Sequence, residues 1–122
     1  MPEKEVRLFM NQQHHANKHK LVEAVLTSPG ATDPALRRIV ETYTSELGGR
    51  PDEQAGKLPA ELATYVDKVA LHAYKTTDED TEALRQAGYS EDAIFEITLS
   101  AALGAGIARL ERGLAVLKGD ER

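Results

Sequence analysis

Apolar residues recur at three- and four-residue spacing along most of the chain, and no stretch alternates with the two-residue period of a β-strand. Residues three and four apart share one face of an α-helix, so this spacing predicts buried helical faces. The predicted fold is therefore all-α, a bundle of about five helices with short loops. Two N-terminal helices are predicted over residues 6–27 and 34–47, and three more within residues 58–117.

Proline and glycine mark the breaks between the first helices. Ser28-Pro29-Gly30 ends the first helix, and Asp33-Pro34 starts the second, with Asp as the cap and Pro at the first helical position. Gly48-Gly49 closes the second helix, and residues 50–57 form a polar loop. Leu58-Pro59 begins the third helix, whose predicted buried stripe ends with Ala73 before a break at residues 74–76.

The segment from Thr77 to Leu117 predicts a short helix, a glycine turn and a long helix. Thr77 and Asp80 have the spacing of a capping box, in which hydroxyl and carboxylate each accept a backbone N–H. Gly88 can adopt the left-handed conformation that often ends a helix. Ser90 is then the cap of the long helix, and Gly119 ends it.

Small side chains dominate the buried face predicted for the long helix. Its apolar positions are Ile94, Ile97, Ala101, Gly104, Ala105 and Ala108. We assign Ala102 and Gly106 to the same small face. Two mid-helix glycines cost roughly 1 kcal/mol each relative to alanine, so we expect close packing against another helix, centrally or at a subunit contact. The uncharged run 97–108 is shorter than the about 20 residues that span a bilayer, so no membrane is predicted as a partner.

Length and composition narrow the possible functions. The 122 residues predict one domain over residues 1–122. A formal net charge of −5 and no basic stripe argue against nucleic acid as the partner. The chain has no cysteine, which excludes disulfides, thiolate catalysis and cysteine-bound metal. No secretion signal is evident, and we expect a cytoplasmic protein.

The histidines near the N-terminus are candidates for a metal site. His15 and His19, with His14 beside them, are spaced so that 15 and 19 share a helix face, as metal-binding pairs do. No Glu lies at a helical offset that supplies a third ligand, and Lys18 and Lys20 add positive charge. We therefore interpret these histidines as solvated surface and predict no metal and no cofactor.

Other polar residues are candidates for a small pocket. Glu61 and His72 lie eleven residues apart on the third helix, roughly 16 Å along its axis, so they cannot pair directly. Tyr74 could line a pocket, although tyrosines at helical spacing are more often at the edge of a core. Asp80 is explained as a helix-start acid. No catalytic triad, phosphate-binding loop or paired-carboxylate motif is evident.

The segment EALRQAGYSEDAIFEITLSAALGAGIARLERGL resembles the alkylhydroperoxidase D-like (AhpD-like) and carboxymuconolactone decarboxylase family. The matching features are a helix ending in ALR-x-AG, then S-E-D-x-I-F-E, then an alanine-rich helix. The preceding LPAELATYVDKVALHAY is similar to the family's entry helix, so the resemblance covers roughly residues 58–117. It implies an AhpD-like helical bundle that assembles as a homo-oligomer.

Redox members of that family carry Cys-x-x-Cys-x-x-x-His with a Glu twelve residues upstream. The two cysteine positions fall at Ala73 and Thr76, the histidine at Asp80 and the glutamate at Glu61, which is the one match. Without a thiolate the relay that the family implies cannot operate, because the thiolate is the nucleophile.

Three functional hypotheses follow. The first is a redox-inactive AhpD-like protein that keeps the oligomeric scaffold or a small-ligand pocket. The second is a cofactor-free lyase that acts on a small carboxylated lactone, with Glu61 or His72 as general base. If the chain is an enzyme, we expect a decarboxylase-like lyase and not a peroxidase. The third is an interaction module whose acidic surface or His-rich start binds a protein partner.

Overall fold

The structure, a computed structural model, describes residues 2–46 and 58–117, with the backbone alone for Arg7, Leu8, Asn11 and His14. This part of the chain is all-α and contains no strand, as the sequence predicts. The predicted ends near residues 47–49 and 119 and the loop 50–57 lie outside the described residues. The elements are α1 (Glu3–Thr27), α2 (Pro34–Ser45), α3 (Ala60–His72), the 3-10 turn η2 (Ala73–Lys75), α4 (Asp78–Gln86) and α5 (Glu91–Leu117).

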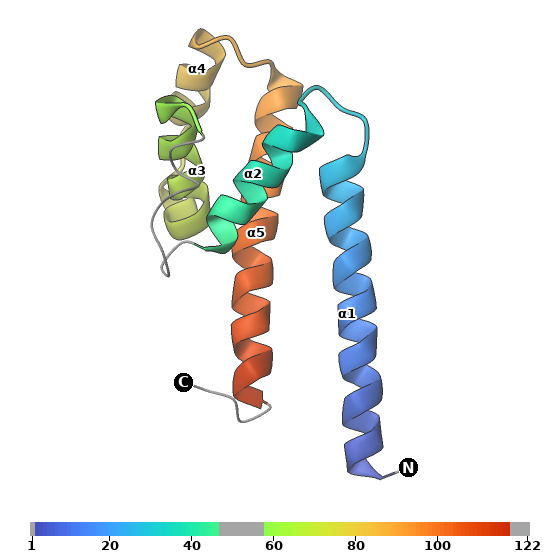
Figure 1. The fold of residues 1–122 in the computed structure, drawn as a ribbon. Helices are drawn as coiled ribbons and strands as arrows, with labels where there is room; N and C mark the ends of the chain where they lie inside the picture. The colour runs from blue at the N-terminus through green and yellow to red at the C-terminus, as the bar shows by residue number, and fades with distance from the viewer. Residues whose placement is uncertain (1, 47–57, 118–122) are drawn as a thin grey trace.

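The two longest helices run antiparallel beside one another, and the shorter helices surround the first half of α5 (Figure 1). The start of α1 and the end of α5 therefore lie at the same end of the molecule (Figure 1). Lys18 of α1 forms an ion pair with Glu111 of α5 across this pair of helices. The shorter helices thus make a compact head, and α1 and α5 extend beyond it.

The predicted capping residues set the helix boundaries. The Asp33 carboxylate accepts a hydrogen bond from the Ala35 N–H at 2.9 Å, and Pro34 follows at the first helical position. Ser90 Oγ accepts from the Ala93 N–H at 3.1 Å. Gly88 has a φ of 107°, the left-handed conformation expected between α4 and α5. Local side-chain chemistry therefore decides where these helices start and stop.

Three boundary predictions are wrong in detail. Helix α1 begins at Glu3 rather than residue 6, and α2 ends at Ser45. Helix α3 begins at Ala60, because Pro59 is an extended N-cap with ψ of 149°. Ala73 is exposed and does not join the buried stripe of α3, since His72 leaves the helical conformation at φ −143° and ψ 54° and starts η2.

The core lies where α2, α3 and α5 meet. Its buried side chains come from all three helices: Val40, Tyr43, Leu62, Tyr65, Val66, Ile94, Ile97 and Ala101. Leu58, two residues before α3, and Leu84 of α4 complete it. Helix α2 crosses α5 so closely that a Cβ added at Gly104 would overlap Thr44 Oγ1 and the Glu41 carbonyl oxygen. The predicted close packing of α5 therefore occurs against α2.

Two charged residues fasten the link between α1 and α2. Arg37 is buried, and its guanidinium donates to the carbonyls of Val25, Ser28 and Thr32 at 2.7, 2.6 and 3.2 Å. From the other side, Glu96 of α5 accepts from the Ala31 and Thr32 N–H groups and the Thr32 hydroxyl at 2.6–2.8 Å. These hydrogen bonds, with the nearby Arg37 charge, lower the pKa of Glu96.

Substituting Gly104→Ala should destabilise the protein by about 1–3 kcal/mol, because the new methyl group has no room between α2 and α5. Gly106→Ala is the matched control, since a Cβ at Gly106 meets nothing within 4 Å. We expect the control to keep or raise stability by up to about 1 kcal/mol through helix propensity. Urea unfolding of dilute protein measures both, and equal effects would contradict the close crossing.

Candidate functional site

The sequence candidates lie around α3, η2 and the start of α4, but they do not form one closed site. Glu61 is in the first turn of α3 and His72 is its last residue, so they stand at opposite ends of that helix. Tyr74 is on η2 with 81% of its surface exposed. Asp80 is in the first turn of α4, where its carboxylate serves the helix cap. Each residue has separate neighbours.

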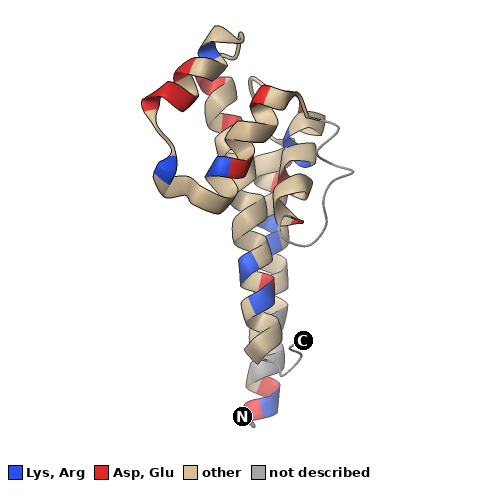
Figure 2. Ribbon diagram, turned by 90° about the vertical axis from the view of Figure 1, so that its left-hand side faces the viewer, with Lys and Arg blue, Asp and Glu red and all other residues tan. Residues whose placement is uncertain are grey.

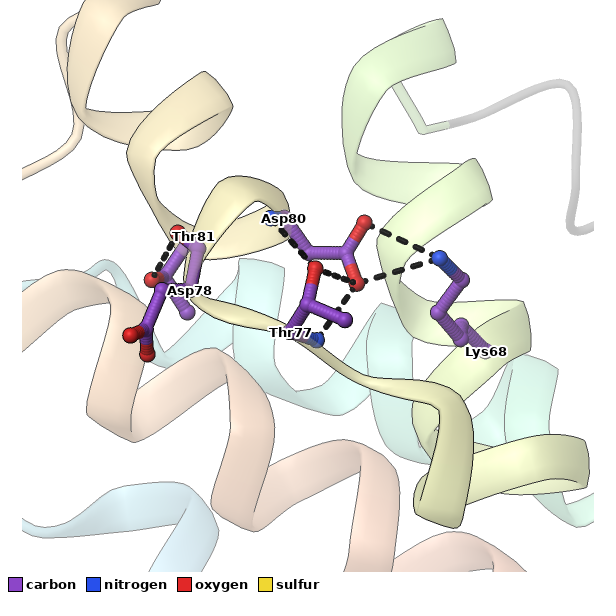
Figure 3. A network of polar contacts seen from close by, with 5 residues as sticks. All are labelled: Lys68, Thr77, Asp78, Asp80 and Thr81. Atoms are coloured by element: carbon purple, nitrogen blue, oxygen red, sulfur yellow. Dashed lines mark hydrogen bonds and ion pairs between the residues drawn. The ribbon is translucent and has the colours of Figure 1, made fainter.

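Asp80 is the centre of a small polar network (Figure 3). Both of its carboxylate oxygens accept from Lys68 Nζ at 3.0 Å, and Oδ2 also accepts from the Thr77 N–H at 2.8 Å. The Thr77 hydroxyl oxygen accepts from the Asp80 N–H, which completes the predicted capping box. The Lys68 hydrogen bonds and the Thr77 N–H hold the pKa of Asp80 below its usual range. The residue at the family's histidine position is thus a structural anion.

Glu61 has one polar neighbour among the described residues. The Tyr89 hydroxyl donates to its Oε2 at 3.4 Å, a long hydrogen bond between α3 and the turn before α5. Partial burial, with the negative charge of Glu61 nearby, raises the pKa of the Tyr89 phenol. The contact ties α3 to the α4–α5 turn, and Glu61 itself is exposed.

Ala73 and Thr76, which the resemblance aligns with the family's two cysteines, offer no accessible nucleophile. Ala73 is exposed at the start of η2. Thr76 Oγ1 is buried and has no hydrogen-bond partner among the described residues. Next to them, the rings of His72 and Tyr74 meet edge to face at 6.2 Å, and Lys75 Nζ lies 5.8 Å from the Tyr74 centroid. This edge of the molecule is an aromatic and cationic surface.

A shallow hollow of about 350 Å³ lies on the outer side of α3. Its lining residues are polar except for one leucine: Thr64, Asp67, Lys68, Leu71, His72 and Lys75. Of the sequence candidates, it includes His72 alone. Asp67 accepts a hydrogen bond from the buried Tyr43, and Lys68 is engaged with Asp80, so much of this polarity is already used within the fold.

A second, smaller hollow of about 190 Å³ lies between α2, α3 and α5. Its walls are Ala70, Leu71, Ala105 and Ala108, and its polar groups are Thr44, Arg109 and Arg112. Arg109 Nη2 donates to the Ala70 carbonyl at 2.7 Å, in the last turn of α3, where carbonyls lack helical partners. Arg112 makes no hydrogen bond or ion pair with any described residue. Two guanidinium groups over apolar walls suit a small carboxylate.

Sequence reasoning missed this arginine pair. The available signal was its spacing: Arg109 and Arg112 are three apart and directly follow the uncharged run 97–108, so both point to one side. The contribution of Thr44 to the wall of the hollow could not be predicted from spacing, because it depends on how α2 crosses α5.

The histidines of α1 are not brought together with other ligands. His15 and His19 are both exposed, and the His14 side chain lies outside the described residues. Within residues 2–46 and 58–117, no group of three His, Cys, Asp or Glu residues is placed to hold a metal ion. Acidic residues are instead dense on α4 (Figure 2), where they start the helix and pair with Lys68 and Arg85.

Comparisons with known proteins identify no relative of this chain. A scan against family models, a search of curated proteins and a search of solved structures each find no match to this chain. The resemblance to the AhpD-like family therefore stays a prediction from the sequence motif.

Substituting Lys68→Met should raise the pKa of Asp80 toward its usual value, because the largest stabilising contact of the carboxylate is lost. A lowered folded-state pKa contributes stability above the unfolded pKa, and this contribution disappears as pH falls through the folded pKa. The variant should therefore lose less stability than the parent between pH 5 and about pH 2. Carboxyl-carbon NMR titration measures the pKa, and an unchanged value would contradict the network; Lys75→Met is the control.

Proposed function

We propose that this chain is a cysteine-free relative of the AhpD-like proteins that acts as a self-associating helical scaffold and not as a thiol peroxidase. The absence of cysteine, with Ala73 and Thr76 at the family's thiol positions, supports the second part. The outer face of α5 supports the first part. The occupant that we propose for that face is a second copy of this chain.

The observation that carries the proposal is an exposed, uncharged stripe along α5, directed away from the core. Its residues recur every three or four positions: Phe95, Leu99, Ala102, Gly106, Leu110, Gly113 and Leu117. At 100° per residue they fall within an arc of about 80°, and they extend over about 33 Å of helix. We call these seven residues the outer stripe. All are exposed, Phe95 by 65% and Leu117 by 77%.

The outer stripe lies opposite the buried face of the same helix. Ile97, Ala101 and Gly104 face α2 and α3, whereas Ala102 and Gly106 face outward and a Cβ at Gly106 meets nothing within 4 Å. A contiguous apolar surface of this kind marks an interaction site on a soluble protein. Small residues within it let another helix backbone come close.

A membrane is the alternative occupant of the stripe. By length and composition alone, α5 meets the test for a membrane span, which core helices of soluble proteins also meet. The buried face of α5 is committed to α2 and α3, and the most apolar window is 39% buried. A narrow apolar stripe on a helix that is otherwise packed or charged fits a protein partner better than surrounding lipid.

The lyase hypothesis gains less support from the geometry. Its candidate bases Glu61 and His72 are at opposite ends of α3, and the carboxylate of Asp80 is engaged with Lys68 and Thr77. A general base must reach the proton that it removes, within hydrogen-bond distance of a bound substrate. The described hollows place neither Glu61 nor Asp80 in their walls.

If the outer stripe is the contact, purified protein should have at least twice the 13.3 kDa mass of one chain. Leu110→Lys should shift it to the monomer mass, because a desolvated ammonium would face the partner helix. Light scattering on eluted fractions over a range of concentrations measures this.

Tyr74→Lys is the matched control, since Tyr74 is 81% exposed but lies on η2, away from the stripe. It should leave the mass unchanged. A parent protein that is monomeric up to millimolar concentration, or that sediments with phosphatidylcholine vesicles instead of associating, would contradict the proposal.

A small-ligand pocket is the second candidate function, and the arginine hollow specifically favours it. Arg112 has no partner among the described residues, and the walls are apolar. The hollow, at about 190 Å³, is below the 300–1,000 Å³ of drug-sized sites, so the ligand would be a small carboxylic acid with a short apolar body.

Butyrate should then shift the amide NMR signals of residues 105–112, and its neutral amide, butyramide, should not. Arg112→Gln should weaken butyrate binding about tenfold or more, because a charge-assisted hydrogen bond contributes about 1.5–3 kcal/mol. Arg38→Gln removes the same charge from an exposed arginine outside the hollow and should have little effect. Equal losses in both variants would indicate general charge attraction only.

A further inference from the structure

We infer that two copies of this chain pair through α5 in antiparallel orientation, about a twofold axis that passes beside Gly106. This inference rests on the self-association proposed above and adds its geometry. The partner is a second copy, because the outer stripe is complementary to itself when it is reversed.

The self-complementarity is visible in the order of large and small residues. Leu99 and Gly113 each lie seven residues from Gly106, one toward the start of α5 and one toward its end. Ala102 and Leu110 each lie four residues from it in the same way. Antiparallel pairing about Gly106 therefore places Leu99 of one copy against Gly113 of the other, and Leu110 against Ala102.

The ends and the centre of the outer stripe fit the same arrangement. Phe95 and Leu117, the two most exposed large side chains of the stripe, each lie eleven residues from Gly106 and would meet across the axis. At the centre, Gly106 meets its own copy, where the lack of side chains lets the two backbones come closest. Interfaces of this twofold kind use one patch on both subunits, so that each contact occurs twice.

Parallel pairing would lose this fit. It would place Leu99 against Leu99 and Gly113 against Gly113, so the helices would be held apart at one level and leave a gap at another. Poorly packed gaps forfeit contact energy along their lining. Antiparallel pairing also sets the positive end of each helix dipole beside the negative end of the other, which is favourable by a small amount.

The stripe offers room for this approach at its glycines. A Cβ built at Gly106 or Gly113 meets no atom within 4 Å, in contrast to Gly104 on the buried face. Leu99 and Leu110 are each 41% exposed, so they project from the surface and can enter the space over the partner's small residues. Large residues on one helix thus fill the depressions of the other, as helix packing requires.

The absence of cysteine from the chain makes a direct test possible, because any introduced thiol is the single thiol of that chain. Chains with Leu99→Cys and chains with Gly113→Cys are mixed in equal amounts and oxidised, and the linked peptides are identified by mass spectrometry. Antiparallel pairing predicts that the 99–113 disulfide forms and that each variant alone stays largely unlinked. A disulfide forms readily when the two Cα atoms are about 4.4–6.8 Å apart.

Three further variants, a second cysteine pair and a background control, keep the test decisive. Ala102→Cys mixed with Leu110→Cys should behave as the first pair does, so the result does not depend on one substitution. Tyr74→Cys lies on the exposed η2 turn away from the stripe and reports chance collisions. Linkage between 99 and 113 that exceeds this background at least several-fold supports the inference.

The possible failures are distinguishable from one another. A parent chain that is monomeric by light scattering overturns the self-association and with it this inference. A parent chain that is dimeric but gives 99–99 and 113–113 links overturns the antiparallel arrangement and leaves self-association standing. A dimer in which none of these variants links above the Tyr74→Cys background overturns the use of the outer stripe.

Discussion

The close crossing of α2 over α5 is the constraint on which the rest of the fold depends. At Gly104, Thr44 and the Glu41 carbonyl occupy the space in which a side chain would stand. Close approach at this point brings Val40 and Tyr43 of α2 into the core beside Ile97 and Ala101. It also places Glu41 where partial burial raises its pKa, because desolvation disfavours the carboxylate. The packing of α2 therefore costs some electrostatic stability, which the buried apolar contacts offset.

The same crossing divides the small residues of α5 between two faces. One set lies against α2, and the other set looks outward with the large side chains of the outer stripe. A helix that has small residues on both sides can pack closely on both sides. The arrangement accounts for why alanine and glycine are so frequent along this helix, beyond what one buried face requires.

Features set by interactions between residues close together in the chain could be predicted from the sequence, whereas features set by packing between helices could not. Asp33, Thr77, Gly88 and Ser90 act within one turn of their own helix, so their roles could be predicted from spacing alone. Ala73 was predicted to be buried and is exposed, because the helix breaks at His72 just before it. The spacing of apolar residues does not indicate this break. The hollow beside Arg109 and Arg112 could not be predicted from the sequence, because its walls come from three helices. The prediction that Ala102 and Gly106 belong to the buried small face is wrong, because α2 and α3 pack on the opposite side of α5 and leave both residues exposed.

The fastening of the α1–α2 link has a consequence for sequence variation. Arg37 and Glu96 hold this link mostly through backbone groups: three carbonyls on one side and two N–H groups on the other. Backbone groups are the same for nearly every amino acid, so most residues of the link can be substituted during evolution without loss of these hydrogen bonds. Gly30 and Thr32 are exceptions, because a Cβ at position 30 would overlap the Glu96 carboxylate and the Thr32 hydroxyl donates to it. Orthologous chains should therefore retain the arginine, the glutamate, this glycine and a hydroxyl residue at position 32 while the other residues of the link diverge.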